Sequence, residues 1–445
     1  MSTDRPLAPW FDDAKFGIMV HWTPACVPAF APRAGVVWEV PDQFRDNPYV
    51  EWYYNSLQIE GSPVRAFHDA TYGRDYPYER FAEEFKRSSA AWDPAPWATL
   101  FAAAGARYVV PVTKHHDGFC LWPSAHVNPK LPPGYGSSRD LIGELGEAVR
   151  AVGLRYGLYY SGGLDWPWHY TPIRSMQTMM ECVPRDPEYV DYAFNQWREL
   201  IDRYEPCTLW NDIWMPGGRE RIAELFDYYL ARVPDGVVND RFHSRLGDDG
   251  LLHSLVHCDY NTPEYQPVAD IRSEKWEAVR GIGHSFGYNR EEGDADYQQP
   301  ADLVHSLIDI VSKNGNLLLN VGPMADGTIP ELQASRLRAV GSFLASYGEA
   351  IYGTRPWTRA EGTTAAGEAV RFTTKGRTLY AVVLAGPRPG ELLLPGVPPV
   401  TAVHLPGHAG ALAFRTEGDG VVVTLPPGLD DGPAFAIALE GAASG

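Results

Sequence analysis

Cysteine is scarce in this chain of 445 residues. There are five cysteines, an odd number, and no two of them form a C-x-x-C pair. This spacing argues against a disulfide framework and against a cysteine-based zinc site. We therefore expect buried free thiols, at Cys26, Cys120, Cys182, Cys207 and Cys258.

Positive charge is also in short supply. The chain has 38 basic against 56 acidic residues, a net charge of −18, which argues against nucleic acid or an anionic membrane as a partner. No apolar run is long enough for a transmembrane helix, and the segment MSTDRPLAPWFDDAKFG lacks the basic and apolar parts of a secretory leader. We expect a cytoplasmic protein with no nucleic-acid and no membrane partner.

Glycine-rich phosphate-binding motifs are missing as well. No G-x-G-x-x-G or G-x-x-x-x-G-K-[ST] pattern follows an expected strand, which weakens a nucleotide-binding function. Aromatic residues, in contrast, make up 12% of the chain, with 14 Trp and 24 Tyr. Their flat apolar faces with a polar edge suit a sugar ring. A large aromatic core explains the same composition equally well.

The order of the expected elements indicates an α/β fold in two domains. Residues 1–352 alternate strand-like and helix-like segments, the pattern of a (β/α)8-like (TIM-type) barrel. A doubly wound open sheet is the alternative. Residues 353–445 change to short β-rich runs between Pro/Gly-rich turns, which predicts a C-terminal β-sandwich. The strand-like runs of the first domain include residues 107–114, 155–160, 207–210, 236–239 and 316–320.

Asp212 is the first catalytic candidate. It follows the apolar run 207–210, within the segment LWNDIW. A carboxylate at the end of a buried strand is costly without partners, and that end of a parallel barrel carries the chemistry. The segment Glu51-Trp52 offers a second carboxylate beside an aromatic wall. A helix-surface acid is at least as good an interpretation of Glu51.

Three histidines also follow strand-like runs: His21, His115 and His116. Imidazole can both donate to and accept from a sugar hydroxyl. Metal binding is the alternative, and a lone His such as His21 is more often a hydrogen-bonded core residue. Adjacent strand residues point to opposite faces. We therefore expect one of His115 and His116 to bind hydroxyls and the other to bond the scaffold.

A second acid and a cation follow later strands. Arg241 comes after the run 236–239, and Glu264 lies in the loop DYNTPEY. A carboxyl group in an apolar aromatic setting is favoured in its protonated form, as a general acid requires. One ionised and one protonated carboxyl group are the requirement of retaining glycoside hydrolysis. A metal-dependent barrel hydrolase and a catalytically silent sugar-binding protein are the alternatives.

The chain resembles the α-L-fucosidases of glycoside hydrolase family 29. The resemblance rests on KFGIMVHWTP, EWYYN, KHHDGFCLWPS, GLYYSGGLDW, LWNDIWMP, NDRF, DYNTPEY, KWEAVRGIGHSFGYNR and NGNLLLNVGPMADGTIP, in this order. The loop at residues 241–256 looks longer than in compact relatives. The resemblance implies a retaining enzyme, without a metal or cofactor, that acts on a fucosylated oligosaccharide or glycoside. We also expect some α-L-galactosidase activity, and a homo-oligomer is an alternative to a monomer.

The resemblance also assigns roles to individual residues. Asp212 corresponds to the nucleophile and Glu264 to the general acid/base. Residues expected to line the fucose pocket are His21, Glu51, Trp52, His115, His116, Tyr159, Trp210, Arg241 and Phe286.

Overall fold

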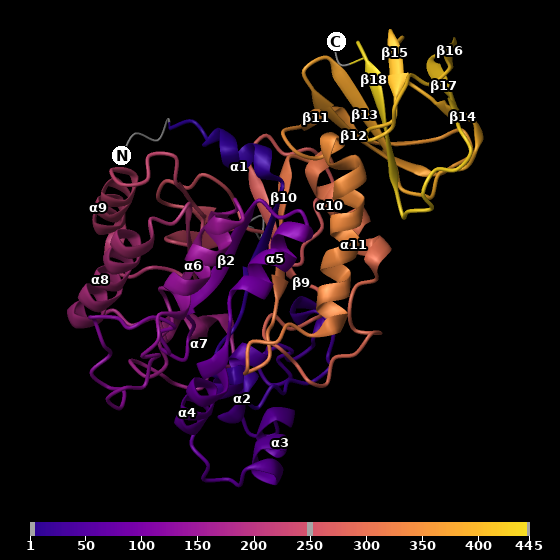
Figure 1. Cartoon of the computed structure of the whole chain (residues 1–445). Coiled ribbons are helices and arrows are strands. Elements are labelled where there is room, and N and C mark those ends of the chain that lie inside the picture. The colour runs from indigo at the N-terminus through magenta and orange to yellow at the C-terminus, as the bar shows by residue number, and fades with distance from the viewer. Residues whose placement is uncertain (1–4, 247–251, 443–445) are drawn as a thin grey trace.

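The first 350 residues are built around one parallel sheet (Figure 1). The computed structural model describes residues 5–246 and 252–442. The sheet runs in the order β6-β5-β4-β2-β1-β10-β9, and β3 pairs with β2 in line with β4. The strands are β1 (Phe16–Val20), β2 (Tyr108–Lys114), β3 (Arg155–Tyr156), β4 (Leu158–Ser161), β5 (Thr208–Asp212), β6 (Val237–Val238), β9 (Trp276–Gly281) and β10 (Gly315–Val321).

An irregular segment, residues 259–265, joins the two end strands of this sheet. Tyr260 forms a parallel bridge with Asn239 beside β6, while Asn261 and Glu264 form parallel bridges with residues of β9. The sheet has seven strand positions around the barrel, and this segment occupies the eighth. The sheet is thereby closed into a barrel, and the expected (β/α)8-like fold is confirmed. The sequence predicts a short strand at 257–260; only single bridges form there.

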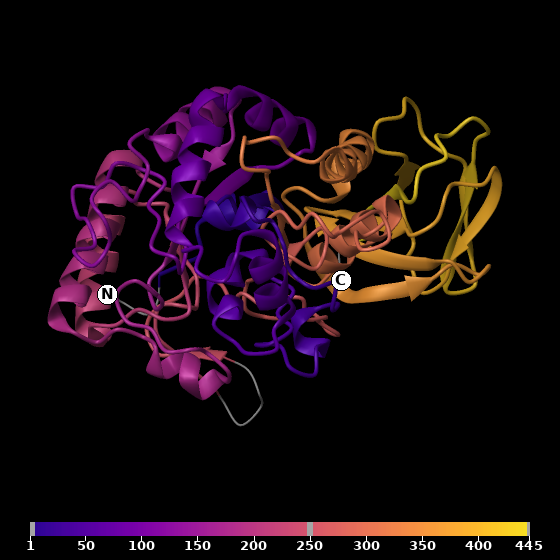
Figure 2. The ribbon, with the colours of Figure 1, turned by 90° about the horizontal axis from the view of Figure 1, so that it is seen from below.

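A ring of helices surrounds the barrel (Figures 1 and 2). Neighbours in this ring contact one another in the order α9-α8-α6-α5-α11-α10. Among the described residues, β6 is followed by no helix before β9; the elements that follow it are the antiparallel strands β7 (Ser244–Leu246) and β8 (Leu252–Ser254). The ring helices are α5 (Ala95–Ala103), α6 (Leu141–Ala151), α8 (Pro187–Tyr204), α9 (Gly218–Leu230), α10 (Pro300–Ser312) and α11 (Glu331–Tyr347).

Helix α8 shows why these segments are helical. Pro187 occupies its first turn, where a missing N–H costs nothing, and Glu205 ends it in a left-handed conformation, φ 41°. Buried residues recur every three or four positions, among them Ala193, Trp197 and Leu200. Each large apolar side chain buried in this way contributes about 1.5–3 kcal/mol. The helix is therefore fixed mainly by its buried stripe.

Shorter helices carry the connections. Most of them lie between β1 and β2, the longest connection in the described part of the barrel. No helix of the described residues is long and apolar enough to cross a membrane. The short elements are α1 (Pro9–Ala14), η1 (Pro24–Cys26), η2 (Val37–Glu39), η3 (Val50–Trp52), α2 (Tyr53–Leu57), α3 (Pro63–Thr71), α4 (Glu79–Ser88), η4 (Ser89–Ala91), α7 (Met176–Glu181) and η5 (Gly348–Ala350).

The C-terminal region consists of antiparallel sheets, as expected. It lies to one side of the barrel, against α10 and α11 (Figures 1 and 2). One sheet has the order β11-β12-β13-β18-β15 and the other β14-β17-β16. The strands are β11 (Arg355–Thr363), β12 (Ala369–Lys375), β13 (Thr378–Val383), β14 (Gly390–Leu394), β15 (Ala402–His404), β16 (Phe414–Glu417), β17 (Gly420–Leu425) and β18 (Phe435–Glu440).

Two details differ from the sequence interpretation. The sequence does not predict strand β11, because its residues RPWTRAEGT contain no apolar run; in the structure four of them are exposed, four are half-buried and one is buried. All five cysteines are free, but Cys258 is only half-buried. The division into domains at residue 352 stays a prediction; the last 3-10 turn of the barrel ends at Ala350 and β11 begins at Arg355.

Candidate active site

The predicted site residues gather at one rim of the barrel. Asp212 is the last residue of β5, and Tyr159 lies in β4. His21 directly follows β1, and His115 and His116 directly follow β2. Parallel strands end at the same rim, so residues far apart in the sequence meet there. The structure brings these side chains together as buried polar groups.

Asp212 is held by donors on both carboxylate oxygens. Its Oδ1 accepts from Arg241 Nη1 at 3.0 Å and from the Ile213 amide at 2.9 Å, and its Oδ2 accepts from the Tyr159 hydroxyl at 2.6 Å. Burial alone would raise the pKa of Asp212, but the Arg241 charge and the Tyr159 hydroxyl together hold it below its ordinary value. Asp212 is therefore an ionised carboxylate at neutral pH.

Arg241 links the two predicted catalytic acids. Its Nη1 binds Asp212, and its Nη2 lies 3.1 Å from Glu264 Oε2. The guanidinium lies over the Trp210 ring, 4.6 Å from the centroid, and its Nε donates to the Thr262 hydroxyl at 2.9 Å. Burial works against its charge, but the two carboxylates more than offset this and raise the pKa of Arg241. The group is a fixed cation between two acids.

Glu264 lies in the segment that closes the barrel. Its Oε1 accepts from the Tyr49 hydroxyl at 2.7 Å, and Arg241 binds its other oxygen. Tyr265, the next residue, has a left-handed backbone, φ 52°, and its hydroxyl is held by the Gly281 amide at 2.8 Å. The surroundings of Glu264 are therefore aromatic, as expected, but they also include a cation that the sequence interpretation did not place there.

The hydrogen bonds of His21 and His116 define their tautomers. Asn320 donates its amide to the Phe286 carbonyl, so its Oδ1, 2.6 Å away, accepts from His21 Nδ1–H. The Ser161 hydroxyl donates to the Leu164 carbonyl, so it accepts from His116 Nδ1–H at 2.6 Å. Burial lowers the pKa of both rings, to about 4 for His21. Each neutral ring keeps a free Nε2 acceptor for a ligand hydroxyl.

The expectation that His115 and His116 point to opposite faces is wrong. Their ring centroids lie 3.9 Å apart, because both residues follow β2 instead of lying in it. His115 stacks on Tyr159, and its Nδ1 has no hydrogen-bond partner among the described residues. His115, His116 and Asp212 each place a potential metal-ligand atom within 4.8 Å of one another. Among the residues that the structure describes, these three side chains form the group whose geometry could hold a metal ion.

Three further predicted pocket residues lie around this group. Glu51 is buried in η3, and its Oε2 accepts from the Gly287 amide at 2.9 Å; burial raises the pKa of Glu51 to about 8. Its alternative interpretation, an acid on a helix surface, is therefore wrong. Trp52 meets His116 edge-on at 5.5 Å. Phe286 lies 5.0 Å from the His21 ring.

Three comparisons with known proteins agree. A family model described as "Alpha-L-fucosidase" matches residues 1–349. Human tissue α-L-fucosidase is 33% identical over 437 residues, covering 95% of this chain and 86% of that protein. The crystal structure of Thermotoga maritima α-fucosidase in complex with a mechanism-based inhibitor has a TM-score of 0.87 and 41% identity, covering 98% and 97% of the two chains. The chain belongs to the α-L-fucosidase family.

Another solved structure, described as α-L-fucosidase, reaches a TM-score of 0.89 at 42% identity and covers 98% of both chains. The α-L-fucosidase from Branchiostoma floridae is 35% identical over 444 residues, 95% of this chain and 89% of that one. Membership of this family of glycoside hydrolases confirms the resemblance that the sequence motifs indicated. Because this is a family of enzymes, the comparison also favours an enzyme over the alternative of a catalytically silent sugar-binding protein.

Trp210, expected as a pocket wall, is only 2% exposed. Its Nε1 donates to Glu277 Oε1 at 3.0 Å, and its ring lies beneath the Arg241 guanidinium.

Three further residues near the predicted catalytic acids were not among the predicted pocket residues. Glu277, Tyr49 and Asn320 also support the site. Two of them carried a signal in the sequence: Asn320 ends the apolar run 316–320, and Glu277 is a carboxylate within the strand β9.

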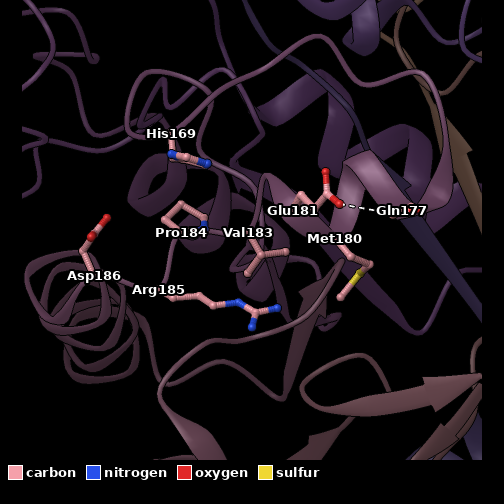
Figure 3. A pocket seen from close by; sticks show the side chains of 8 residues that line it. All are labelled: His169, Gln177, Met180, Glu181, Val183, Pro184, Arg185 and Asp186. Atoms are coloured by element: carbon pink, nitrogen blue, oxygen red, sulfur yellow. Dashed lines mark hydrogen bonds between the residues drawn. The ribbon is translucent and has the colours of Figure 1, made fainter.

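A separate cavity of about 520 Å³ lies beside α7 and the start of α8 (Figure 3). It contains none of the predicted site residues. Arg185 belongs to its lining and lies over the Trp214 ring at 5.6 Å. The other lining residues are His169, Gln177, Met180, Glu181, Val183, Pro184 and Asp186.

The sequence predicts a long loop at residues 241–256. Residues 247–251 of this loop lie outside the described residues.

A strained turn behind Asp212 leads to a first prediction. Ile213 and Trp214 have φ of 65° and 151°, a costly conformation for such residues. A Cβ on Gly163 would lie 2.8 Å from the Trp214 carbonyl oxygen and 2.9 Å from its amide nitrogen. We expect Gly163→Ala to displace this turn and its bond to Asp212, and to lower kcat about 10²-fold, measured with an aryl α-L-fucoside.

The matched control is Gly293→Ala. A Cβ there meets nothing within 4 Å, so its kcat and its melting temperature should stay within experimental error of the wild type. If Gly163→Ala keeps wild-type kcat, the strained turn has no part in holding Asp212.

Proposed function

We propose that this protein is a retaining exo-α-L-fucosidase that acts by double displacement, with Asp212 as nucleophile and Glu264 as general acid/base. The observation that carries the proposal is the shared Arg241, whose Nη1 and Nη2 contact one oxygen of each acid. A single guanidinium between two carboxylates supports the short separation, about 5–5.5 Å, of retaining enzymes.

In the first step, ionised Asp212 attacks the anomeric carbon of an α-L-fucoside. The bond to the leaving oxygen breaks as Glu264 gives that oxygen its proton, and a β-fucosyl ester forms on Asp212. In the second step, Glu264 takes a proton from water. The resulting hydroxide attacks the same carbon from the α face and releases α-L-fucose with Asp212 restored as a carboxylate.

The remaining side chains would recognise fucose. We assign the Nε2 acceptors of His21 and His116 to sugar hydroxyls, because their Nδ1–H groups are already used by Asn320 and Ser161. Phe286, beside His21, would contact the C6 methyl group. An apolar contact rejects an added hydroxyl only weakly, so slow hydrolysis of α-L-galactosides is part of the proposal.

The single most informative test is the stereochemistry of the first product. We expect α-L-fucose to appear first when an aryl α-L-fucoside is hydrolysed in an NMR tube, before it equilibrates with the β anomer. Initial β-L-fucose would mean an inverting mechanism and a different role for Asp212.

Metal dependence is the competing mechanism, favoured by the His115–His116–Asp212 group. Against it, both Asp212 oxygens already accept hydrogen bonds, and one of the donors is a cation. A cation at Oδ1 repels a second cation. We therefore expect full activity after dialysis against EDTA, assayed with an aryl α-L-fucoside. Loss of activity that zinc restores would support the metal mechanism instead.

A further inference from the structure

Trp38 stands apart from the other tryptophans of this chain. All 14 lie in the described residues, and Trp38 is the exposed one, at 49%. Its neighbour Val37 is buried in the same cluster as Tyr49, Trp52 and Phe286. The 3-10 turn η2 is therefore anchored at the site by Val37 while it turns the indole of Trp38 outward. Burial does not explain a tryptophan at this position.

The indole is tied to the residue that we assign as acid/base. Its Nε1–H donates to the main-chain carbonyl of Glu264 at 3.0 Å. That carbonyl has a fixed direction, because Glu264 pairs with Val279 of β9 and the Tyr265 amide donates to the Val279 carbonyl at 3.2 Å. The ring consequently lies against the wall segment that carries Glu264, with half of its surface open to solvent.

The proposed reaction determines which part of the substrate lies next to the Trp38 indole. Glu264 protonates the oxygen of the leaving group, so the leaving group leaves the pocket on the Glu264 side. His21 and Glu51, which we expect to contact fucose, are only 5% and 3% exposed, so the terminal sugar that they bind is enclosed by the barrel rim. The next sugar of the substrate then lies at the exposed side of the segment, where Trp38 is.

Resting on the proposed function, we infer that Trp38 is a binding platform for the leaving-group sugar, a pyranose that presents its C–H face to the indole. A flat exposed indole binds such a face by apolar contact and C–H contacts to its π system. The Nε1–H bond to Glu264 fixes the ring in the orientation that the sugar meets. The same platform would receive an acceptor sugar in the second step and so favour transfer of fucose to it over hydrolysis.

The test compares two substrates with the same fucose and different leaving groups. α-L-Fucosyl fluoride has no leaving sugar, whereas fucosyl disaccharides with α-1,2, α-1,3, α-1,4 or α-1,6 linkages do; the disaccharide that wild type cleaves fastest is used. For Trp38→Ala we expect the ratio of kcat/KM, disaccharide over fluoride, to fall about tenfold. The fraction of fucose transferred to added galactose or N-acetylglucosamine should fall with it.

Trp38→Phe separates the platform from the hydrogen bond. It keeps an aromatic face but loses the N–H, so its ratio should stay within about threefold of wild type. Phe414→Ala, which removes another exposed aromatic ring, 38% exposed in β16, should leave both substrates unaffected.

Three outcomes would overturn the inference: an unchanged ratio in Trp38→Ala, an equal fall in Trp38→Phe, which would assign the effect to the bond with Glu264, or wild type that cleaves the fluoride but none of the disaccharides. If wild type cleaves neither, the proposed function itself fails.

Discussion

Asp212→Gly is expected to lose at least about 10³-fold in kcat on an aryl α-L-fucoside, which is roughly 4 kcal/mol of transition-state stabilisation. In the proposed mechanism the variant lacks the oxygen that bonds the anomeric carbon, while the Arg241 and Tyr159 donors that now hold Asp212 remain. The space left beside these donors suits a small anion. Added azide should therefore restore turnover and yield β-L-fucosyl azide, measured by NMR.

The configuration of the azide product decides this test. Azide that replaces the nucleophile attacks from the β face, once, and inverts the centre. Near-normal activity of Asp212→Gly, or rescue that gives the α azide, would contradict the assignment of Asp212. Asp212→Asn serves as a second variant, because it retains the side-chain volume and excludes azide; it should be inactive and should not be rescued.

Glu264→Ala is expected to show the second largest effect, and one that depends on the leaving group. General acid catalysis contributes about 10²–10⁴-fold. We expect a loss in that range for kcat/KM on fucosyl disaccharides, whose leaving alcohols need a proton, and a much smaller loss on dinitrophenyl fucoside. Azide should then attack the fucosyl ester and yield α-L-fucosyl azide, the opposite anomer from that of Asp212→Gly.

Glu291 provides the matched control for this acid. It is exposed and lies in the described residues, so Glu291→Ala should have wild-type kinetics on both substrates. An equal loss on disaccharides and dinitrophenyl fucoside in Glu264→Ala would place the acid/base elsewhere.

Most of the site residues that could be predicted from the sequence are polar residues at the ends of apolar, strand-like runs. Asp212, His21, His115 and His116 were found because each follows or ends an apolar run, and parallel strands of a barrel end at a common rim. The short β-rich runs between Pro/Gly-rich turns after residue 352 likewise indicated antiparallel sheets. These features depend on local patterns of side chains, which are visible without any knowledge of the fold.

Features that depend on distant contacts could not be predicted in this way. Segment 259–265 joins β6 to β9 by single bridges, and nothing in its own residues shows that it closes a barrel. Glu277 supports Trp210 from the neighbouring part of the wall, a contact between residues 67 positions apart. The orientation of His115 and His116 was wrong because the strand ends one residue before them.

The guanidinium of Arg241, which contacts one oxygen of each acid, sees a constant charge throughout the proposed cycle. Before attack, Asp212 is anionic and Glu264 is neutral. In the ester intermediate, Asp212 is neutral and Glu264 is anionic. One negative charge faces the cation in both states and merely changes sides, so the protein needs no reorganisation between the two half-reactions. Arg241 thereby keeps the two halves of the cycle electrostatically balanced against each other.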